Sequence, residues 1–247
     1  MRLISRLAMA PFLAMPAIAR RRLVQLVSRA SATRPPAQAL RELLTMASDV
    51  SGQIDLAALA YGDGVHVKHR IMRYHDFFVQ RIKDGERVLD IGCGYGAVSN
   101  SIATRTGAHV VGLDLSGDNV TKARQLFQHS RLTFMEGEAP AVLPEGRFDV
   151  VVMSNVLEHI ERRVEFLREV QRKVTPSRWL IRVPMFDRDW HPSLRQELGL
   201  YAFSDPTHFT EYTLASFEKE MAEAGFTIRH LQVNWGEIWA EVAAAHG

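Results

Sequence analysis

The sequence has 247 residues, 47% of them hydrophobic and 23% charged, which suits one large domain with an appendage or two small domains. Its single cysteine, Cys93, excludes an intrachain disulfide and favours a reducing compartment. The net charge is +2, but residues 1–41 hold eight arginines and no acidic residue. The rest carries 22 basic and 28 acidic residues, so the body of the protein is a poor electrostatic match for nucleic acid.

The N-terminal leader, residues 1–35, combines these arginines with an apolar run over residues 7–19. The run is shorter than the ~20 residues that a spanning helix needs, and the three arginines that follow it oppose export. Residues 1–30 form either a basic amphipathic segment that contacts a membrane surface or partner, an arm without a membrane role, or a cleaved targeting sequence. We expect a cytoplasmic protein, peripheral at the inner membrane surface if the first interpretation holds.

Residues 36–84 are predicted to form an N-terminal helical extension. Pro35 and Pro36 separate it from the leader, and short helical stretches are expected up to residue 60. Over residues 66–82, apolar side chains recur at steps of three and four, which predicts one helix with an apolar face. The residues of that face are Val67, Ile71, Tyr74, Phe78 and Ile82. The histidines of this helix are interpreted as structural residues or as part of a lid over a ligand.

From residue 85 onward, strand and helix patterns alternate. The predicted strands are residues 87–91, 109–113, 132–135, 148–153, 179–183, 226–233 and 237–242. The predicted helices are residues 96–106, 118–129, 162–174 and 214–224. Thr213 is the expected N-cap of the last helix, and Gly225 follows its end. This alternation predicts an α/β fold with a doubly wound, mostly parallel seven-stranded sheet over residues 85–247.

The stretch RVLDIGCGYG, residues 87–96, places three glycines directly after the first predicted strand. Glycines at a strand–helix turn let the backbone approach a ligand, and such sheets bind ligands beyond the carboxyl ends of their strands. The glycine spacing satisfies the dinucleotide-binding pattern G-x-G-x-x-G/A. Asp90 at the tip of the strand would repel a pyrophosphate, however, and suits an ammonium group such as that of S-adenosylmethionine.

Two further acids follow later strands. Asp114 ends the second predicted strand, about twenty residues on, where a carboxylate can bind both hydroxyls of a ribose. This feature serves a dinucleotide and S-adenosylmethionine equally. Glu138, in EGEAP after the third strand, could accept a hydrogen bond from an adenine amine.

The fourth strand runs into FDVVVMSNVLEHI, residues 148–160. With VLDIGCGYG, the acid of GLDLS and the late AGF in this order, the sequence from residue 85 resembles the class I S-adenosylmethionine-dependent methyltransferases. LEHI is most similar to the small-molecule branch, which includes methyltransferases of quinone biosynthesis. The resemblance implies S-adenosyl-L-methionine as the cofactor. Signatures of nucleic-acid amino-group methylation are absent, because Ser154, Asn155 and Val156 stand in their place.

The resemblance also implies a set of cofactor-binding residues: Asp90, Gly92, Cys93, Gly94, Gly96, Asp114, Leu115, Glu138, Ala139 and Asn155. The plainer interpretation is that the glycines serve the turn and the acids cap strand ends. Cys93 is interpreted as a small space-filling residue and not as a nucleophile. Glu158 is expected to open the helix after the fourth strand, at its dipole end, and His159 is a candidate catalytic residue near the methyl donor.

Residues 183–213 are the least generic part of the domain, and we call them the roof segment. In related methyltransferases, elements beyond the fifth strand cover the acceptor pocket. The acids and histidines of the segment are Asp187, Asp189, His191, Asp205, His208 and Glu211. Methyl transfer to a hydroxyl needs a base, and His208 is the leading candidate. Binding of a divalent metal and capping of surface turns stay as alternatives, and no metal site is predicted.

These observations favour an S-adenosylmethionine-dependent methyltransferase that acts on a small-molecule, lipid-linked or glycan acceptor. Oxygen is the favoured acceptor atom. One alternative is a protein that keeps the methyltransferase fold and binds without turnover. The other is an NAD-linked oxidoreductase with the same sheet, against which Asp90 counts. The basic, apolar leader favours an acceptor at a membrane, such as a quinone precursor or a lipid-carried sugar.

Overall fold

The structure is a computed structural model that describes residues 9–245, and the chain divides into two compact units. The first unit runs up to His66 and also includes Arg195–Leu200, whereas the second comprises Val67–Leu194 and the chain from Tyr201 onward. The predicted division into residues 1–35, 36–84 and 85–247 stays a prediction.

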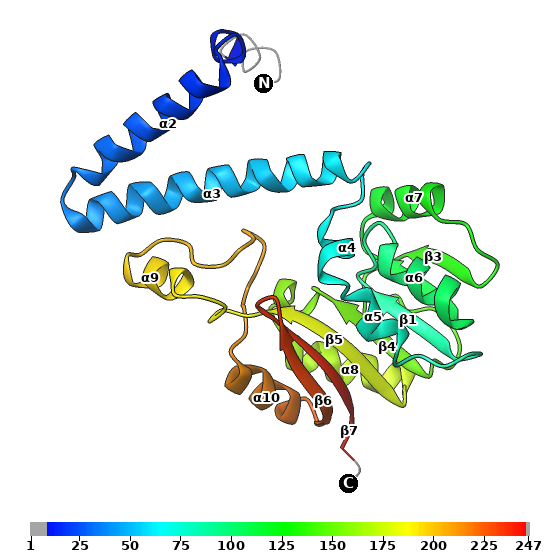
Figure 1. Cartoon of the computed structure of the whole chain (residues 1–247). Coiled ribbons are helices and arrows are strands. Elements are labelled where there is room, and N and C mark those ends of the chain that lie inside the picture. Colours follow the sequence, from blue (N-terminus) through cyan, green and yellow to red (C-terminus); the bar gives the residue numbers. More distant parts are fainter. Residues whose placement is uncertain (1–8, 246–247) are drawn as a thin grey trace. The chain divides into compact units, whose positions relative to one another are not determined.

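The first unit is built on two helices, α2 (Ala17–Ala32) and α3 (Pro36–Tyr61) (Figure 1). Pro36 is the first residue of α3, where its fixed φ suits the first turn and its missing N–H is not needed. The expected series of short helices is wrong, because α3 continues for 26 residues and a single internal Gly52 costs only about 1 kcal/mol. Residues 1–8, with the first part of the predicted leader, lie outside the described residues.

The second unit contains a seven-stranded sheet. Its strands are β1 (Arg87–Ile91), β2 (His109–Asp114), β3 (Leu132–Glu136), β4 (Val150–Ser154), β5 (Arg178–Pro184), β6 (Phe226–Asn234) and β7 (Glu237–Ala244). Their order is β3-β2-β1-β4-β5-β7-β6, and β1 to β5 run parallel while β7 pairs antiparallel with β5 and β6 (Figure 1). The predicted mostly parallel, doubly wound sheet is therefore confirmed.

The central strands β1, β4 and β5 are buried on both faces, which explains why they read as continuous apolar runs. In β4, Val151 and Met153 belong to the core on one face, with residues of α8 (Arg163–Val174) and α10 (Leu214–Glu223). Val150 and Val152 belong to the core on the other face. That second core also takes residues from α5 (His75–Val79), α6 (Ala97–Thr106) and α7 (Gly117–Leu126).

The single helix predicted over residues 66–82 is wrong. The structure has two short helices, α4 (Lys68–Met72) and α5, separated by Arg73 in the left-handed conformation at φ 53°. The break brings Tyr74 into the core, where its hydroxyl lies 2.6 Å from Nδ1 of His69. Ile71, predicted on the apolar face, is 53% exposed instead.

Candidate active site

The three glycines after β1 all have positive φ, but their surroundings differ. A Cβ at Gly92 would lie 2.5 Å from Val156 Cγ2, and one at Gly96 would lie 2.4 Å from Phe134 Cζ. A Cβ at Gly94 would meet no atom within 4 Å. Packing therefore demands glycine at positions 92 and 96, whereas the backbone at Gly94 borders open space that a ligand could occupy.

Asp114 at the end of β2 joins two loops. Its Oδ2 accepts a hydrogen bond from the Gly94 N–H at 2.8 Å. Its Oδ1 accepts from the Ser116 N–H and from the Asn119 side-chain amide, both at 3.0 Å. A carboxylate offers about four acceptor positions, so these three protein donors leave roughly one for a ligand. Asp114 therefore orders the glycine loop as well as facing the cavity described below.

Asp90 is only 1% exposed, and its carboxylate accepts a hydrogen bond from the hydroxyl of Ser99 on α6 at 2.5 Å. Burial raises the pKa of Asp90 to about 7, so a large fraction of the carboxyl groups is protonated near neutral pH. Asp90 is not among the residues that line the cavity. Its predicted contact with an ammonium group stays a prediction.

A cavity of about 550 Å³ lies beyond the ends of β1 and β2. Six of the predicted site residues line it: Gly92, Asp114, Leu115, Glu138, Ala139 and His159. The other six do not: Asp90, Cys93, Gly94, Gly96, Asn155 and His208. Sequence reasoning missed Val156, Ile160, Arg162, Glu165 and Phe166, which also line the cavity. These residues follow β4, where the apolar pattern indicates helix packing but not which turn faces a cavity.

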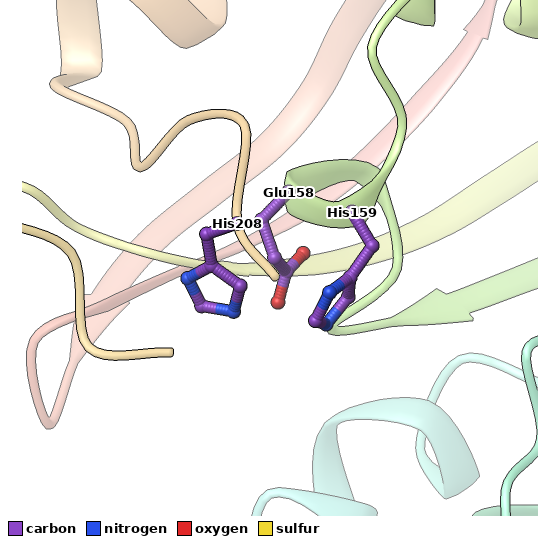
Figure 2. Close-up of side chains that lie close together, drawn as sticks. All are labelled: Glu158, His159 and His208. Atoms are coloured by element: carbon purple, nitrogen blue, oxygen red, sulfur yellow. The ribbon is translucent and has the colours of Figure 1, made fainter. Parts of the chain in front are cut away.

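Next to this cavity, Glu158, His159 and His208 form a compact cluster, which we call the Glu–His–His cluster. One candidate ligand atom from each residue lies within 4.8 Å of the other two, and Figure 2 shows the Glu158 carboxyl between the two rings. The rings of His159 and His208 have their centroids 4.7 Å apart. Because His159 also lines the cavity, it connects the expected cofactor site to His208 on the roof segment.

The expectation that Glu158 opens the helix after the fourth strand is wrong. Helix α8 begins at Arg163, and Glu158 lies in a separate 3₁₀ turn, Leu157–His159. The roof segment covers this turn, because the N–H of Phe209 donates to the carbonyl of Glu158 at 2.8 Å. Glu158 is consequently buried, with 0% of its surface exposed.

His208 is oriented by a buried carboxylate. Its Nδ1 lies 3.0 Å from Oε1 of Glu211, whose side chain is fully buried. Burial opposes ionisation of Glu211, but hydrogen bonds from His208, Ser204 and Arg188 outweigh it and lower its pKa to about 2. An ionised Glu211 accepts a hydrogen bond from Nδ1–H, which leaves the other ring nitrogen of His208 as a proton acceptor.

His159 is held by the roof segment as well. Its Nδ1 lies 2.9 Å from the hydroxyl of Thr207, which in turn donates to Asp205 at 2.6 Å. Burial and the neighbouring His208 lower the pKa of His159, so its ring stays neutral over a wider pH range.

Three buried side-chain oxygens near the cluster lack a hydrogen-bond partner among the described residues: both carboxyl oxygens of Glu158 and Oδ1 of Asn155. Burial raises the pKa of Glu158 to about 8. Unpaired buried acceptors are costly, which marks this place as one where a ligand donor or cation could bind. A carboxylate and two imidazoles could hold a divalent metal, and the carboxylate partner of His208 would suit such a site.

Two further findings concern single residues. Cys93 is buried and burial raises the pKa of its thiol, which agrees with a space-filling role.

Arg182 on β5, absent from the predicted site, is buried at 3% exposure and binds Glu237 through two nitrogens at 2.6 and 2.7 Å. It also donates to the Ser154 hydroxyl at 2.8 Å. A lone arginine within a strand pattern gives no sequence signal for such a network.

Comparisons with known proteins agree with this geometry. A family model described as a methyltransferase domain matches residues 65–231. A ubiquinone biosynthesis O-methyltransferase of Azorhizobium caulinodans is 33% identical over 166 residues, which is 64% of this chain and 65% of that protein. A ribosomal protein L11 methyltransferase of Burkholderia orbicola is 37% identical over 41% of this chain and 32% of that protein. A fatty-acid O-methyltransferase of Mycolicibacterium smegmatis is 31% identical over 46% of this chain and 42% of that protein.

The aligned part of the chain therefore spans less than two thirds of the length of these relatives. Among solved structures, magnesium protoporphyrin IX methyltransferase from Synechocystis, with bound S-adenosylhomocysteine, superposes with a TM-score of 0.58 at 21% identity. The superposition covers 73% of this chain and 85% of that one. Because the family model covers more than half of the sequence, the chain belongs to the methyltransferase domain family and has the fold of the class I S-adenosylmethionine-dependent methyltransferases.

Proposed function

We propose that the protein transfers a methyl group from S-adenosylmethionine to a hydroxyl of a small-molecule, lipid-linked or glycan acceptor. The observation that carries the proposal is the position of His159, which lines the cavity and contacts the ring of His208. The cavity proposed for the cofactor and the proposed base, His208, are therefore connected through His159. The names of two relatives, a ubiquinone biosynthesis O-methyltransferase and a fatty-acid O-methyltransferase, support transfer to oxygen.

The residues present fit the cofactor. The cavity has a volume of about 550 Å³, in the range typical of small-molecule sites. Asp114 lies at its wall with one acceptor position left for a ribose hydroxyl, and exposed Glu138 lies at the same wall within the expected reach of an adenine amine. The open space beside Gly94 allows the backbone to approach the cofactor.

In the proposed mechanism, S-adenosylmethionine supplies a methyl group on a sulfonium, and the protein aligns it with the acceptor and removes the acceptor proton. His208 accepts the hydroxyl proton on the ring nitrogen that Glu211 leaves free. Glu211, buried and ionised, stabilises the imidazolium that results. The roof segment, through the Phe209 N–H bond to Glu158, covers the place of transfer and limits the access of water.

Calorimetric titration separates this proposal from its two alternatives. We expect S-adenosylmethionine to bind and NAD not to bind, whereas an oxidoreductase would show the reverse. A protein that binds without turnover would bind S-adenosylmethionine but form no S-adenosylhomocysteine with any acceptor. The acceptors to test first are a prenylated catechol and a long-chain fatty acid, because both carry an acidic hydroxyl on an apolar body.

We further propose that the protein works in the cytoplasm, peripheral at the inner membrane surface, where lipid-linked acceptors lie. The support is the leader, since its arginines occur without a single acid up to residue 41. Within the described part of the chain, no helix is long and apolar enough to cross a membrane.

A further inference from the structure

Most apolar and basic side chains of helix α2 lie on different sides of the helix. At about 100° per residue, Leu23, Leu26 and Val27 fall on one side, while Arg21, Arg22 and Arg29 fall on the other. The separation is not complete, because Arg20 projects beside Val27 and Ile18 beside Arg29. The three apolar side chains are 38%, 64% and 49% exposed. No residue of α2 is buried, so its apolar face is not used in the core of the first unit.

The charge of this region indicates what covers that face. Residues 1–41 contain eight arginines and no aspartate or glutamate, so the basic side chains of α2 have no acidic neighbours in the same segment of sequence. An anionic surface would neutralise them, and an apolar phase would accept Leu23, Leu26 and Val27. The headgroup region of an anionic bilayer offers both at once, whereas nucleic acid offers no apolar phase.

The length of α2 decides between lying on a bilayer and crossing it. Its 16 residues span about 24 Å at 1.5 Å per residue, which is less than the ~30 Å of a hydrocarbon core. The four arginines within the helix would also have to enter the hydrocarbon. The helix is therefore suited to the plane of the interface.

We infer that α2 binds anionic phospholipid surfaces, with Leu23, Leu26 and Val27 inserted at the boundary of headgroups and acyl chains and Arg21, Arg22 and Arg29 bound to headgroups. The inference deepens the proposed membrane placement and does not depend on methyl transfer. Binding there brings the protein to the membrane in which lipid-linked acceptors are dissolved.

Flotation of the full chain with vesicles tests the inference. We expect binding to vesicles of equal parts phosphatidylglycerol and phosphatidylcholine, weak binding to pure phosphatidylcholine, and a fall in binding with added salt. The triple variant Arg21→Gln, Arg22→Gln, Arg29→Gln should bind about a hundredfold more weakly. The triple variant Leu23→Ser, Leu26→Ser, Val27→Ser should bind at least about tenfold more weakly with its net charge unchanged.

Control variants lie in the second unit, where Arg172→Gln and Val233→Ser remove exposed side chains of the same kinds and should leave vesicle binding unchanged. Equal binding to both vesicle types, or wild-type binding by the serine variant, would overturn the inference, the latter in favour of purely electrostatic adsorption without insertion of the apolar side chains. Calorimetry with S-adenosylmethionine on the same variants keeps the two proposals apart. Cofactor binding should be unchanged in all of them, so loss of vesicle binding alone does not touch the proposed methyl transfer.

Discussion

The Nδ1 atom of His208 lies 3.0 Å from a carboxyl oxygen of Glu211, and the Glu211 side chain has no exposed surface. Only two residues lie between them in the sequence, and they meet in an irregular part of the roof segment and not on a helix. The pair has the geometry in which a buried carboxylate fixes the tautomer of an imidazole and leaves its second nitrogen basic. This relationship makes Glu211 a positioning residue for the proposed base.

Glu211→Gln should therefore lower kcat by about 10- to 100-fold, as the loss of an outer partner of a functional histidine typically does. KM for the acceptor and the affinity for S-adenosylmethionine should stay close to wild type, because Glu211 contacts neither. Steady-state kinetics and calorimetry measure the two effects. Asp187→Asn, an exposed acid of the same segment, is the matched control. An unchanged kcat in Glu211→Gln would remove the positioning role.

Asp114→Asn should weaken the binding of S-adenosylmethionine by about 1–3 kcal/mol, because a charge-assisted hydrogen bond to the ribose is lost. The amide also cannot accept hydrogen bonds on both sides, so either the bond from the Gly94 N–H or those from Ser116 and Asn119 are lost and the melting temperature should fall as well. Calorimetry and thermal unfolding report the two effects separately. Asp118→Asn, exposed on α7, should change neither. Wild-type affinity in a destabilised Asp114→Asn variant would show that Asp114 is structural alone.

Gly94→Asn should abolish cofactor binding while the fold survives. Asparagine tolerates the left-handed conformation of this position, and its side chain would enter the open space beside the loop. Gly96→Ala, in contrast, should destabilise the whole domain, because its Cβ would lie 2.4 Å from Phe134. Circular dichroism, thermal unfolding and calorimetry distinguish the two variants. Tight cofactor binding by Gly94→Asn would place the cofactor elsewhere.

Proton release tests the predicted contact between Asp90 and the cofactor ammonium. The ordinary pKa of an aspartate is about 3.9, and burial raises that of Asp90 to about 7, so at pH 6 the carboxyl is mostly protonated. A nearby ammonium favours the charged carboxylate and lowers the pKa, so binding at pH 6 should release close to one proton. Calorimetry in buffers of different ionisation enthalpy measures this release. Asp90→Asn should abolish it, and an absence of release in the wild type would mean that the ammonium binds away from Asp90.

Much of the fold could be predicted from the sequence because its central strands are buried on both faces. Each of the seven predicted strands overlaps an observed one, and the glycine turn after β1 lies where its pattern indicates. The break at Arg73 could not be predicted, because the apolar spacing of three and four continues across it and only the packing of Tyr74 requires the turn. The burial of Glu158 could not be predicted either. It depends on the roof segment, whose Phe209 N–H binds the Glu158 carbonyl and lies about fifty residues later in the chain.

Some features of the candidate site could likewise be predicted from the sequence, and others could not. The positions of Asp114 and Glu138, at or just beyond strand ends, follow from the strand pattern, and both residues line the cavity. The double role of Asp114 does not follow, because its three donors come from the glycine loop, the turn after β2 and helix α7. The proximity of His159 and His208 depends on how the roof segment folds back over β4, and local sequence patterns carry no information about that return.

The most direct test of the proposed reaction is to measure S-adenosylhomocysteine and methylated product together by mass spectrometry, with a prenylated catechol as acceptor. We predict that wild-type protein forms both in equal amounts, with and without a metal chelator. His208→Ala should form them about 10²- to 10⁴-fold more slowly at unchanged affinity for S-adenosylmethionine, the range expected for loss of a general base. Wild-type rates in His208→Ala would contradict its role as the base, and a loss of activity with chelator that Mg²⁺ restores would assign the Glu–His–His cluster to a metal instead.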